Sequence, residues 1–416
     1  MSQAADDPCS GLQQPLMSVE DTVATLLEHA HPIEENERVL LGEASGRILT
    51  RDLVSPIDVP GFDNSAMDGY ALHSRDMELA QTRGLVISQR IPAGVHGRLL
   101  QPGSAARIFT GAPVPEGADT VVIQESCRLE GDRMLIERPA NPGANIRPRG
   151  NDITAGDTIL PAGTLLQAAQ LGLAASVGIA EIEVRRRLRV AVFSTGDELI
   201  EPGQPLAFGQ IYNSNRTLLN ALLEAQGCKV VDLGSIADNL DATRAALSTA
   251  AATTDLVITS GGVSVGEEDH VKAALQSLGE LTLWRVRMKP GKPLAFGHIG
   301  AVPFIGLPGN PVSVFVTFLL FARPCLHRLQ GRAQTRPLYW PVLAGFDHRS
   351  SNRREYLRVR VSGDPLNGLN AEKFPRQGSD VLSSVAWAEG LVEIPENVHV
   401  HPGDTLRYLP FSEWAR

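Results

Sequence analysis

Two lysines stand three residues apart in Lys289-Pro290-Gly291-Lys292-Pro293, where a proline–glycine turn is expected. The chain has 38 basic residues, and arginine fills nearly all the other basic positions. A lysine ammonium is a compact point charge, whereas an arginine guanidinium is planar and directional. Two ammonium groups on one turn would neutralise a dense anion; the alternative is an ordinary solvated hairpin turn.

A glycine-rich segment, Ser260–Gly266, lies between an apolar strand and an expected helix. Its backbone N–H groups and the helix N-terminus could bind an anion such as phosphate, although the spacing fits neither a dinucleotide fingerprint nor a P-loop. The alternative is a plain strand-to-helix turn. The segment also contains a G-x-S-x-G match centred on Ser264, which would suit a serine hydrolase if His298 or His327 completed a triad. A nucleophile elbow, however, places its serine directly after the strand, and this strand ends at Thr259.

Two carboxylates, Asp238 and Asp269, follow neighbouring strands of the expected sheet. Carboxylate and phosphate oxygens are ligands that Mg²⁺ prefers, so this pair beside a phosphate-binding loop would form a magnesium site. Glu267 and Glu268 precede Asp269 in the same helix start. Acidic residues are favoured there by the helix dipole without any functional role.

Three further groups of polar residues could be functional. The stretch Pro60–Ala71 shows no secondary-structure period. Long irregular segments inside compact domains are usually functional, although an ordered surface loop is the alternative. Arg147–Asp152 brings two arginines and an aspartate around a turn, which is more often solvated than a site. His399 and His401 alternate on an expected strand and are either a pair of metal ligands or two surface residues.

The loops that carry the anion-binding candidates must be brought together by the elements around them. Residues 187–330 alternate apolar strands with helical patterns, which is typical of an α/β domain with a mostly parallel sheet. In such a sheet, ligands bind beyond the carboxyl ends of the strands. The expected strand ends are followed by polar loops at Ser194–Glu198, Asp238, Ser260–Asp269 and Gly306–Asn310.

The remaining segments predict a multidomain chain of α/β and β parts. Residues 56–144 contain short β-like runs between glycine and proline turns, which indicates an inserted β-rich domain. The flanking residues 16–55 and 145–186 would form a mixed α/β domain, with a first helix capped by Ser18. Residues 336–416 alternate apolar and polar positions without a helical pattern, which predicts a C-terminal β-barrel.

The composition argues against several classes of protein. The 416 residues carry a net charge of −9, which is unfavourable for a general nucleic-acid binder. The cysteines form no C-x-x-C pair, so a zinc ribbon is excluded. The N-terminus lacks the apolar stretch of a signal peptide. The longest apolar run, Val312–Ala322, is shorter than the roughly 18 residues that span a bilayer. We therefore expect a soluble, cytoplasmic protein.

Six motifs together resemble the molybdopterin molybdenumtransferase (MoeA) family, to which the C-terminal domain of gephyrin is similar. The motifs follow the family's order, and the C-terminal part matches more weakly, through Glu355–Arg358 and Gln377–Ser379. The six motifs are Phe62–Ala71, Thr110–Pro115, Ser194–Leu199, Ser260–Gly266, Lys289–Pro293 and Gly306–Pro311. Asn213 is a mild departure, because aspartate is expected there in many relatives.

The resemblance implies a homodimer of four-domain subunits. Its active site would lie between the molybdopterin-binding α/β domain of one subunit and the inserted β-rich domain of the other. The implied transferase takes adenylylated molybdopterin and molybdate and gives molybdenum cofactor and AMP, with Mg²⁺ or a similar divalent ion. An upstream adenylyltransferase and downstream molybdoenzyme chaperones would be partners, without nucleic acid or membrane. A non-catalytic gephyrin-like scaffold and the single-domain adenylyltransferase that shares the α/β domain are the alternatives.

The resemblance also implies roles for individual residues. The Ser260–Gly266 loop would hold the pterin phosphate, and Lys289 and Lys292 would meet molybdate or phosphate. Arg358 and Ser379 would complete an oxyanion pocket. The expected catalytic residues are Asp68, Thr110, Glu198, Asp238, Asp269, Lys289 and Lys292. The expected binding residues are Ser260, Gly261, Gly262, Ser264, Gly266, Pro308, Asn310, Asp152, Arg358 and Ser379. The expected metal ligands are Asp238 and Asp269.

Overall fold

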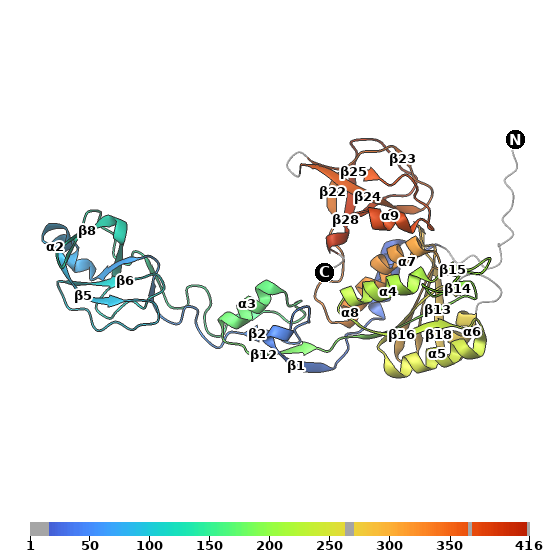
Figure 1. The fold of residues 1–416 in the computed structure, drawn as a ribbon, viewed down its shortest axis with the longest axis horizontal. Coiled ribbons are helices and arrows are strands. Elements are labelled where there is room, and N and C mark those ends of the chain that lie inside the picture. The colour runs from blue at the N-terminus through green and yellow to red at the C-terminus, as the bar shows by residue number, and fades with distance from the viewer. Residues whose placement is uncertain (1–15, 263–269, 365–367, 414–416) are drawn as a thin grey trace. The chain divides into compact units, whose positions relative to one another are not determined.

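The computed structural model describes residues 16–262, 270–364 and 368–413 (Figure 1). The chain forms two compact units. Unit 1 takes in residues 1–37, 46–50 and 184–416, and unit 2 takes in residues 38–45 and 51–183.

Unit 1 is built around a six-stranded sheet of β13 (Arg189–Thr195), β16 (Lys229–Ile236), β17 (Leu256–Ser260), β18 (Gly279–Arg285), β20 (Pro293–Ile299) and β21 (Val302–Leu307). The strand order is β16-β13-β17-β21-β20-β18. The first four strands are parallel, and β20 pairs antiparallel with both of its neighbours, β21 and β18. The expected mostly parallel sheet is therefore confirmed. Residues 190–193 of the central strand β13 have no exposed surface, as expected where both faces of a sheet are covered.

Helices cover both faces of this sheet. Since successive side chains of a strand point to opposite faces, alternate residues of β13 contact different helices. Val190 and Val192 pack in a cluster with residues of the first, fourth and seventh helices. Ala191 and Phe193 pack with the fifth and sixth helices on the other face. The first helix begins as predicted, because the Ser18 hydroxyl accepts a hydrogen bond from an N–H three residues on. The helices are α1 (Val19–Glu28), α4 (Ser214–Ala225), α5 (Leu240–Thr253), α6 (His270–Leu278), α7 (Pro311–Thr317) and α8 (Arg323–Leu329).

A π-helical turn at Phe318–Ala322 joins α7 to α8, so Pro311–Leu329 is one helical segment. By length and composition this segment could cross a membrane, but 94% of its apolar window is buried inside the protein. It therefore serves as the core helix of unit 1. The apolar run seen in the sequence, Val312–Ala322, is only its first part, because buried polar residues such as Arg323 and His327 continue it.

The C-terminal part of unit 1 is the predicted barrel, formed by β22 (Trp340–Ala344), β24 (Arg354–Asp364), β25 (Gly368–Lys373), β26 (Gly390–Ile394) and β28 (Thr405–Pro410). The ring closes because β24 pairs with both β25 and β26. The expectation that this region has no helix is wrong, since Leu382–Trp387 forms α9. Six residues are too few to display a helical period in sequence, and Ser384 of this helix is fully buried. A short strand, β19 (Met288–Lys289), pairs in parallel with the start of β24.

Unit 2 contains a six-stranded β-sheet in the order β7-β4-β6-β5-β9-β8. The polar stretch Pro60–Ala71 was expected to be irregular, but it includes two strands, β3 (Asn64–Ser65) and β4. All four residues of β4 are buried, and a fully buried strand does not alternate in sequence. The sheet strands are β4 (Gly69–Leu72), β5 (Leu85–Ile91), β6 (Ser104–Ile108), β7 (Thr120–Ile123), β8 (Cys127–Glu130) and β9 (Arg133–Ile136). The other elements are β1 (Asn36–Leu40), β2 (Leu53–Val54), β10 (Ile146–Arg147), β11 (Thr158–Leu160), β12 (Glu181–Arg185), α2 (Met77–Thr82) and α3 (Ala168–Ser176).

Candidate active site

A cavity of about 710 Å³ opens in unit 1 where the carboxyl ends of the parallel strands meet the barrel. The end of β17, the lysine turn, the loop before α7 and a turn of the barrel all line it. The predicted site residues that line this cavity are Gly261, Gly262, Lys289, Lys292, Pro308, Asn310 and Ser379. The structure therefore brings together residues from four separate segments of the sequence.

The glycine loop begins where the chain must pass close to neighbouring atoms. The Gly261 N–H donates to the Leu307 carbonyl at 3.1 Å, which ties the end of β17 to the end of β21. Gly262 has φ +63°, and a Cβ there would lie 2.4 Å from Val271 Cγ2. A side chain is therefore excluded by backbone conformation and by space. The remaining predicted residues of this loop, Ser264, Gly266 and Asp269, lie outside the described residues.

The two lysines of the turn have different surroundings. Lys289 lies on β19 opposite Glu355 of β24, and its Nζ is 3.6 Å from Glu355 Oε2. Lys292 also lines the cavity, and within the described residues it forms no ion pair. Gly291 between them has φ +102°, and a Cβ there would lie 2.5 Å from Thr317 Cγ2 of α7. The turn is thus held against the core helix, with Lys292 as the less neutralised charge.

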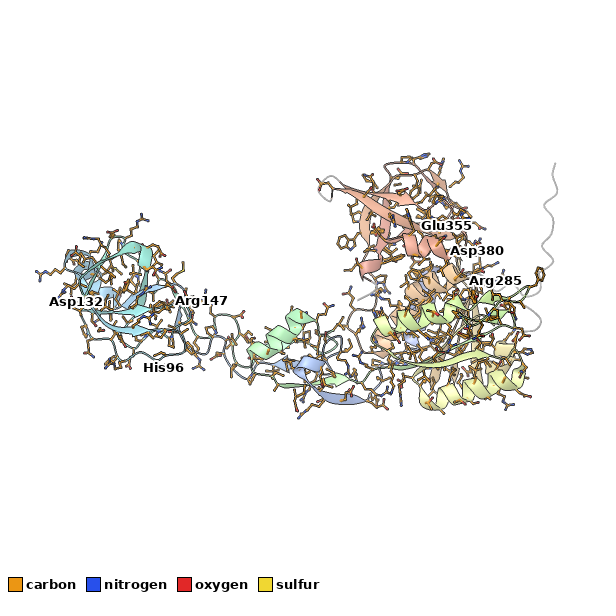
Figure 2. The ribbon with its side chains drawn as sticks, viewed as in Figure 1. His96, Asp132, Arg147, Arg285, Glu355 and Asp380 are labelled. Carbon is orange, nitrogen blue, oxygen red and sulfur yellow. The ribbon has the colours of Figure 1, made fainter. Side chains whose placement is uncertain are left out.

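Glu355, labelled in Figure 2, is a buried carboxylate. It stays ionised and forms an ion pair with Lys289. Burial raises the pKa of Glu355, but hydrogen bonds from the N–H and hydroxyl of Ser351 and the charge of Lys289 outweigh it, so the pKa is lowered. His348 Nε2 also lies 3.1 Å from Glu355 Oε2. Glu355 therefore fixes the position of Lys289 rather than lining the cavity itself.

The barrel contributes the turn that carries Ser379. Asn310 Nδ2 donates to Ser379 Oγ at 3.1 Å, and the Val312 N–H donates to the Ser379 carbonyl at 3.0 Å. These bonds join the turn to the start of α7. Asp380, which follows in sequence, lines the same cavity.

Arg358, expected to complete an oxyanion pocket with Ser379, lies beneath this turn and lines neither cavity described here. Its guanidinium donates to the Gly378 carbonyl, to Ser384 Oγ and to the Tyr356 carbonyl at 3.0–3.2 Å. Burial lowers the pKa of Arg358 to about 10. Arg358 therefore holds the turn in place.

A second cavity, of about 600 Å³, shares Gly261, Gly309, Asn310 and Asp380 with the first. Two further predicted residues, Glu198 and Ser260, line it. Its outer wall includes the paired strands β14 (Leu199–Ile200) and β15 (Ile211–Tyr212). Because the two cavities share one wall, together they form a crevice along the strand ends, which we call the strand-end crevice.

Asn213, the residue that departs from the expected aspartate, lines this second cavity but is almost fully buried. Its side-chain oxygen accepts from the Arg216 N–H and caps α4. Its Nδ2 donates to Ser235 Oγ at 3.1 Å. An aspartate could cap the helix but could not donate that hydrogen bond.

Three predicted residues belong to unit 2. Asp68 and Thr110 lie together, because the Thr110 N–H and hydroxyl both donate to Asp68 Oδ1 at 2.8 Å. These hydrogen bonds lower the pKa of Asp68, which is half-buried and ionised. Asp152 is exposed in a turn, where its N–H donates to the Val59 carbonyl at 2.9 Å.

Asp238 follows β16, is exposed, and lines neither part of the strand-end crevice.

The structure does not support the hydrolase alternative, because neither histidine that could have completed a triad lines the crevice. His327 is buried, lies 2.8 Å from Gln226 Oε1, and has its pKa lowered by burial to about 2. His298 packs edge-on against Phe296, away from the crevice.

Several crevice residues were missed by the sequence analysis, chiefly Asp380, Asn215, Ser313 and Arg353. Asn215 donates to the Gly309 carbonyl at 2.7 Å, so it shapes the loop before α7. Asp380 directly follows the Gln377–Ser379 motif. This position next to a family-like motif could have marked it as a candidate site residue. The sequence could not show that this barrel turn meets the strand ends.

Three family models match the chain. They are the MoeA N-terminal region (domain I and II) over residues 17–178, a probable molybdopterin binding domain over 191–328, and the MoeA C-terminal region (domain IV) over 342–411. Together they match most of the chain.

Similar proteins and structures point the same way. A molybdopterin molybdenumtransferase of Haemophilus influenzae is 39% identical over 403 residues, covering 95% of this chain and 99% of its own length. One from a Nostoc species is 41% identical, covering 82% and 81%. A crystal structure of a molybdopterin biosynthesis moeA protein from Pyrococcus horikoshii OT3 matches with a TM-score of 0.83 and 28% identity, covering 95% of this chain and all of that one.

Proposed function

We propose a specific reaction for this chain, which belongs to the molybdopterin molybdenumtransferase family: it inserts molybdate into adenylylated molybdopterin and releases AMP and molybdenum cofactor. The chain is a transferase of molybdenum cofactor biosynthesis. The observation that supports the finer reaction is the strand-end crevice, where a glycine loop and two lysines surround one cavity.

The crevice offers separate binding groups for the two anions of this reaction. The glycine loop that begins after the Ser260 hydroxyl lines both cavities and suits the phosphate of the pterin. Lys289 and Lys292, which line the same cavity, suit molybdate. In a site shielded from water, each charge-assisted hydrogen bond from an ammonium to an oxyanion contributes about 1.5–3 kcal/mol.

A divalent metal fits the chemistry of the donor set. Glu198, Asp380 and Ser260 supply carboxylate and hydroxyl oxygens along the second cavity, and Mg²⁺ prefers such hard oxygen ligands. We propose that the metal binds these crevice oxygens together with the substrate's phosphates. Of the two ligands expected from the sequence, Asp238 does not line the crevice and Asp269 lies outside the described residues. The bound metal would neutralise charge on the adenylyl pyrophosphate. The residues of the crevice bind and orient the substrates around it.

We further propose that the protein acts as a homodimer with four-domain subunits and that residues of unit 2 complete the site of the partner copy. Asp68 and Thr110 belong to the family-like motifs, and Asp152 is a further expected site residue. All three lie in unit 2, whereas the crevice is built from unit 1. An ionised Asp68, held by Thr110, would add a carboxylate beside the metal and pyrophosphate. The adenylylated substrate would come from an adenylyltransferase, and the product would pass to a molybdoenzyme chaperone.

The test is to incubate the purified chain with adenylylated molybdopterin and Mg²⁺, with and without molybdate. AMP and molybdenum cofactor should appear together, in a ratio of about one to one, only when molybdate is present. AMP released without any bound molybdenum would show simple hydrolysis of the adenylyl group. Pterin binding without AMP release would instead make the chain a non-catalytic scaffold of this fold.

A further inference from the structure

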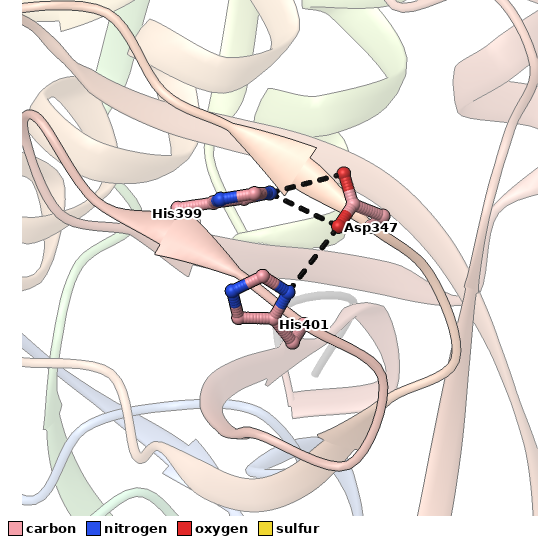
Figure 3. Close-up of side chains that lie close together, drawn as sticks. All are labelled: Asp347, His399 and His401. Atoms are coloured by element: carbon pink, nitrogen blue, oxygen red, sulfur yellow. Dashed lines mark hydrogen bonds and ion pairs between the residues drawn. The ribbon is translucent and has the colours of Figure 1, made fainter.

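Figure 3 shows a cluster of three possible metal ligands in the C-terminal barrel region. None of the three lines the strand-end crevice. Its members are Asp347, His399 and His401. The two histidines lie at positions i and i+2 of the segment at β27 (His399–Val400), so their side chains leave the same face. This segment pairs antiparallel with β23 (His348–Arg349), a register that places Asp347 opposite His401 and diagonal to His399. Strand pairing, rather than flexible loops, therefore sets the positions of all three side chains.

The distances within the cluster fit the edges of a tetrahedral site. Asp347 Oδ2 lies 3.0 Å from His399 Nε2 and 3.4 Å from His401 Nδ1. Zinc ligands at about 2.0–2.1 Å from the metal stand roughly 3.3 Å apart in a tetrahedron. The potential ligand atoms of all three residues lie within 4.8 Å of one another. A small rotation of the exposed imidazoles would bring the remaining pair to that spacing.

The backbone around the cluster is held in place. The His401 N–H donates to Asp404 Oδ2 at 2.7 Å, and Lys373 Nζ donates to the Asp347 carbonyl at 2.7 Å. The three side chains themselves are accessible, with exposed fractions of 63% for Asp347, 35% for His399 and 59% for His401. An ion could reach them from solvent without opening the fold.

The ligand types select the class of ion. Two imidazole nitrogens and one carboxylate suit Zn²⁺ and similar transition ions, whereas Mg²⁺ and Ca²⁺ prefer sites made of oxygen ligands. Three protein ligands leave the fourth tetrahedral position to water. One competing group is present, because Arg349 Nη2 lies 3.4 Å from His399 Nδ1. Arg349 is exposed on a long side chain, so it can turn away when a metal occupies the opposite nitrogen, Nε2.

We propose that Asp347, His399 and His401 form a binding site for one Zn²⁺-class divalent ion on the C-terminal barrel. This site is separate from the magnesium proposed for the crevice, and it does not depend on the proposed reaction. A bound ion would cross-link the β23 and β27 segments. Loss of an outer-shell partner of a metal ligand typically costs about 10- to 100-fold in affinity, so loss of a direct ligand should cost at least about tenfold.

The experiment is isothermal titration of the untagged, chelator-treated full chain with ZnCl₂. Wild type should bind one tight equivalent, and His399→Ala, His401→Ala and Asp347→Asn should each bind it at least about tenfold more weakly. Asp347→Asn keeps the side-chain shape, so its effect cannot be ascribed to misfolding. His31→Ala, which removes an exposed histidine outside the cluster, should match wild type.

Three results would overturn the proposal, two from the Zn²⁺ titrations and one from competition with Mg²⁺. The first is the absence of a tight Zn²⁺ equivalent in wild type. The second is equal Zn²⁺ affinity in wild type and all three cluster variants, which would place the ion elsewhere. Millimolar Mg²⁺ added before the titration should leave the Zn²⁺ affinity unchanged, and strong competition would also contradict a nitrogen-rich site.

Discussion

Arg358 illustrates how a residue can matter to a site that it does not line. The sequence places it next to Glu355 in a weakly matching motif, and its expected partner Ser379 does reach the strand-end crevice. Arg358 itself is fully buried and bonds to carbonyl and hydroxyl oxygens that shape the turn before Ser379. Sequence reasoning found the right residue and could not distinguish direct contact from support, because burial depends on the fold.

Arg358→Lys should destabilise the protein and loosen the turn. A lysine keeps the charge but cannot make the three hydrogen bonds of the guanidinium fork, so buried acceptors lose their donors. Each such loss costs about 1–3 kcal/mol, and we expect a decrease of about 2–4 kcal/mol in the free energy of unfolding. Urea unfolding measures this directly. The control, Arg328→Lys, lies exposed at the end of α8 and should change stability by less than about 0.5 kcal/mol. An Arg358→Lys protein as stable as the control would show that the fork is dispensable.

At the level of elements, the loops at the strand ends were predictable because their flanking strands are continuous apolar runs. Residues 190–193 and the other buried strands mark where each loop must begin. The meeting of the lysine turn with α7 and the barrel was not predictable. It depends on β19 pairing with β24, and a two-residue strand carries no period in sequence. The β4 strand was also missed. All four of its residues are buried, so its sequence does not alternate between apolar and polar residues.

Gly291→Ala tests how strictly the lysine turn is held. An added Cβ meets Thr317 Cγ2 at 2.5 Å, and φ +102° is unfavourable for any residue with a side chain. Strain of about 1–2 kcal/mol and crowding of about 1–3 kcal/mol should add, giving a loss of about 2–5 kcal/mol measured by urea unfolding. Gly300→Ala is the matched control. It also has positive φ, but a Cβ there would meet nothing within 4 Å.

The control should therefore lose only the backbone strain. If both variants lose the same stability, the contact with α7 does not constrain the turn. If the lysine turn moves in Gly291→Ala, the half-saturating molybdate concentration should rise as well. It should stay unchanged in Gly300→Ala.

Asp255 joins the starts of β13 and β17 and gives the fold a dependence on pH. It accepts two hydrogen bonds from Arg186, at 2.6 and 2.7 Å, and one from the Arg189 N–H at 2.7 Å. Burial raises the pKa of Asp255, but these bonds and charges outweigh it and lower the pKa. Folding therefore favours the ionised carboxylate.

Asp255→Asn should lower the free energy of unfolding by about 1.5–3 kcal/mol at pH 7, because bonds to a charged group are lost. Since the folded pKa is the lower one, the stabilisation is fully present above the unfolded value near 3.9 and is lost as pH falls through the folded pKa. The difference between wild type and variant should thus shrink below about pH 4. Urea midpoints across pH measure it, with Glu130→Gln of the exposed Arg128–Glu130 pair as a control expected to change little. A difference that persists unchanged to pH 2 would exclude the carboxylate as its source.

For the whole molecule, the sequence predicted the α/β sheet and the C-terminal barrel, and both are present. The helix α9 was missed because it is short and stabilised by tertiary contacts. Site residues were predicted in both units, and the structure brings most of the described ones of unit 1 together around one crevice. Asp238 and Arg358 are the exceptions, because neither lines it. Which copy of the chain supplies Asp68 and Thr110 to a given site is a question of assembly, which local sequence patterns do not encode.

Mixing two inactive variants tests the proposed shared site. In a hybrid dimer of Asp68→Ala and Lys292→Ala subunits, one of the two sites would combine unaltered residues from both chains. In a twofold-symmetric dimer with random exchange, about a quarter of wild-type activity should therefore return. AMP release measures this at a molybdate concentration where neither variant is active alone. Subunit exchange should first be confirmed, for example by mass spectrometry. If activity still does not rise, each site is built from one chain.

Molybdate-dependent AMP release by point variants is the most direct measure of what the strand-end crevice does. Lys292 lines the cavity without an ion pair among the described residues, whereas Lys289 is partly neutralised by Glu355. Lys292→Ala should raise the half-saturating molybdate concentration about 10- to 100-fold, since about 1.4 kcal/mol corresponds to tenfold. Lys289→Ala should have a smaller effect, and Lys292→Arg should restore binding only in part. Lys229→Ala, which removes an exposed lysine at the start of β16, should match wild type. An unchanged molybdate dependence in Lys292→Ala would contradict oxyanion binding by this turn and leave the lysines as solvated surface residues.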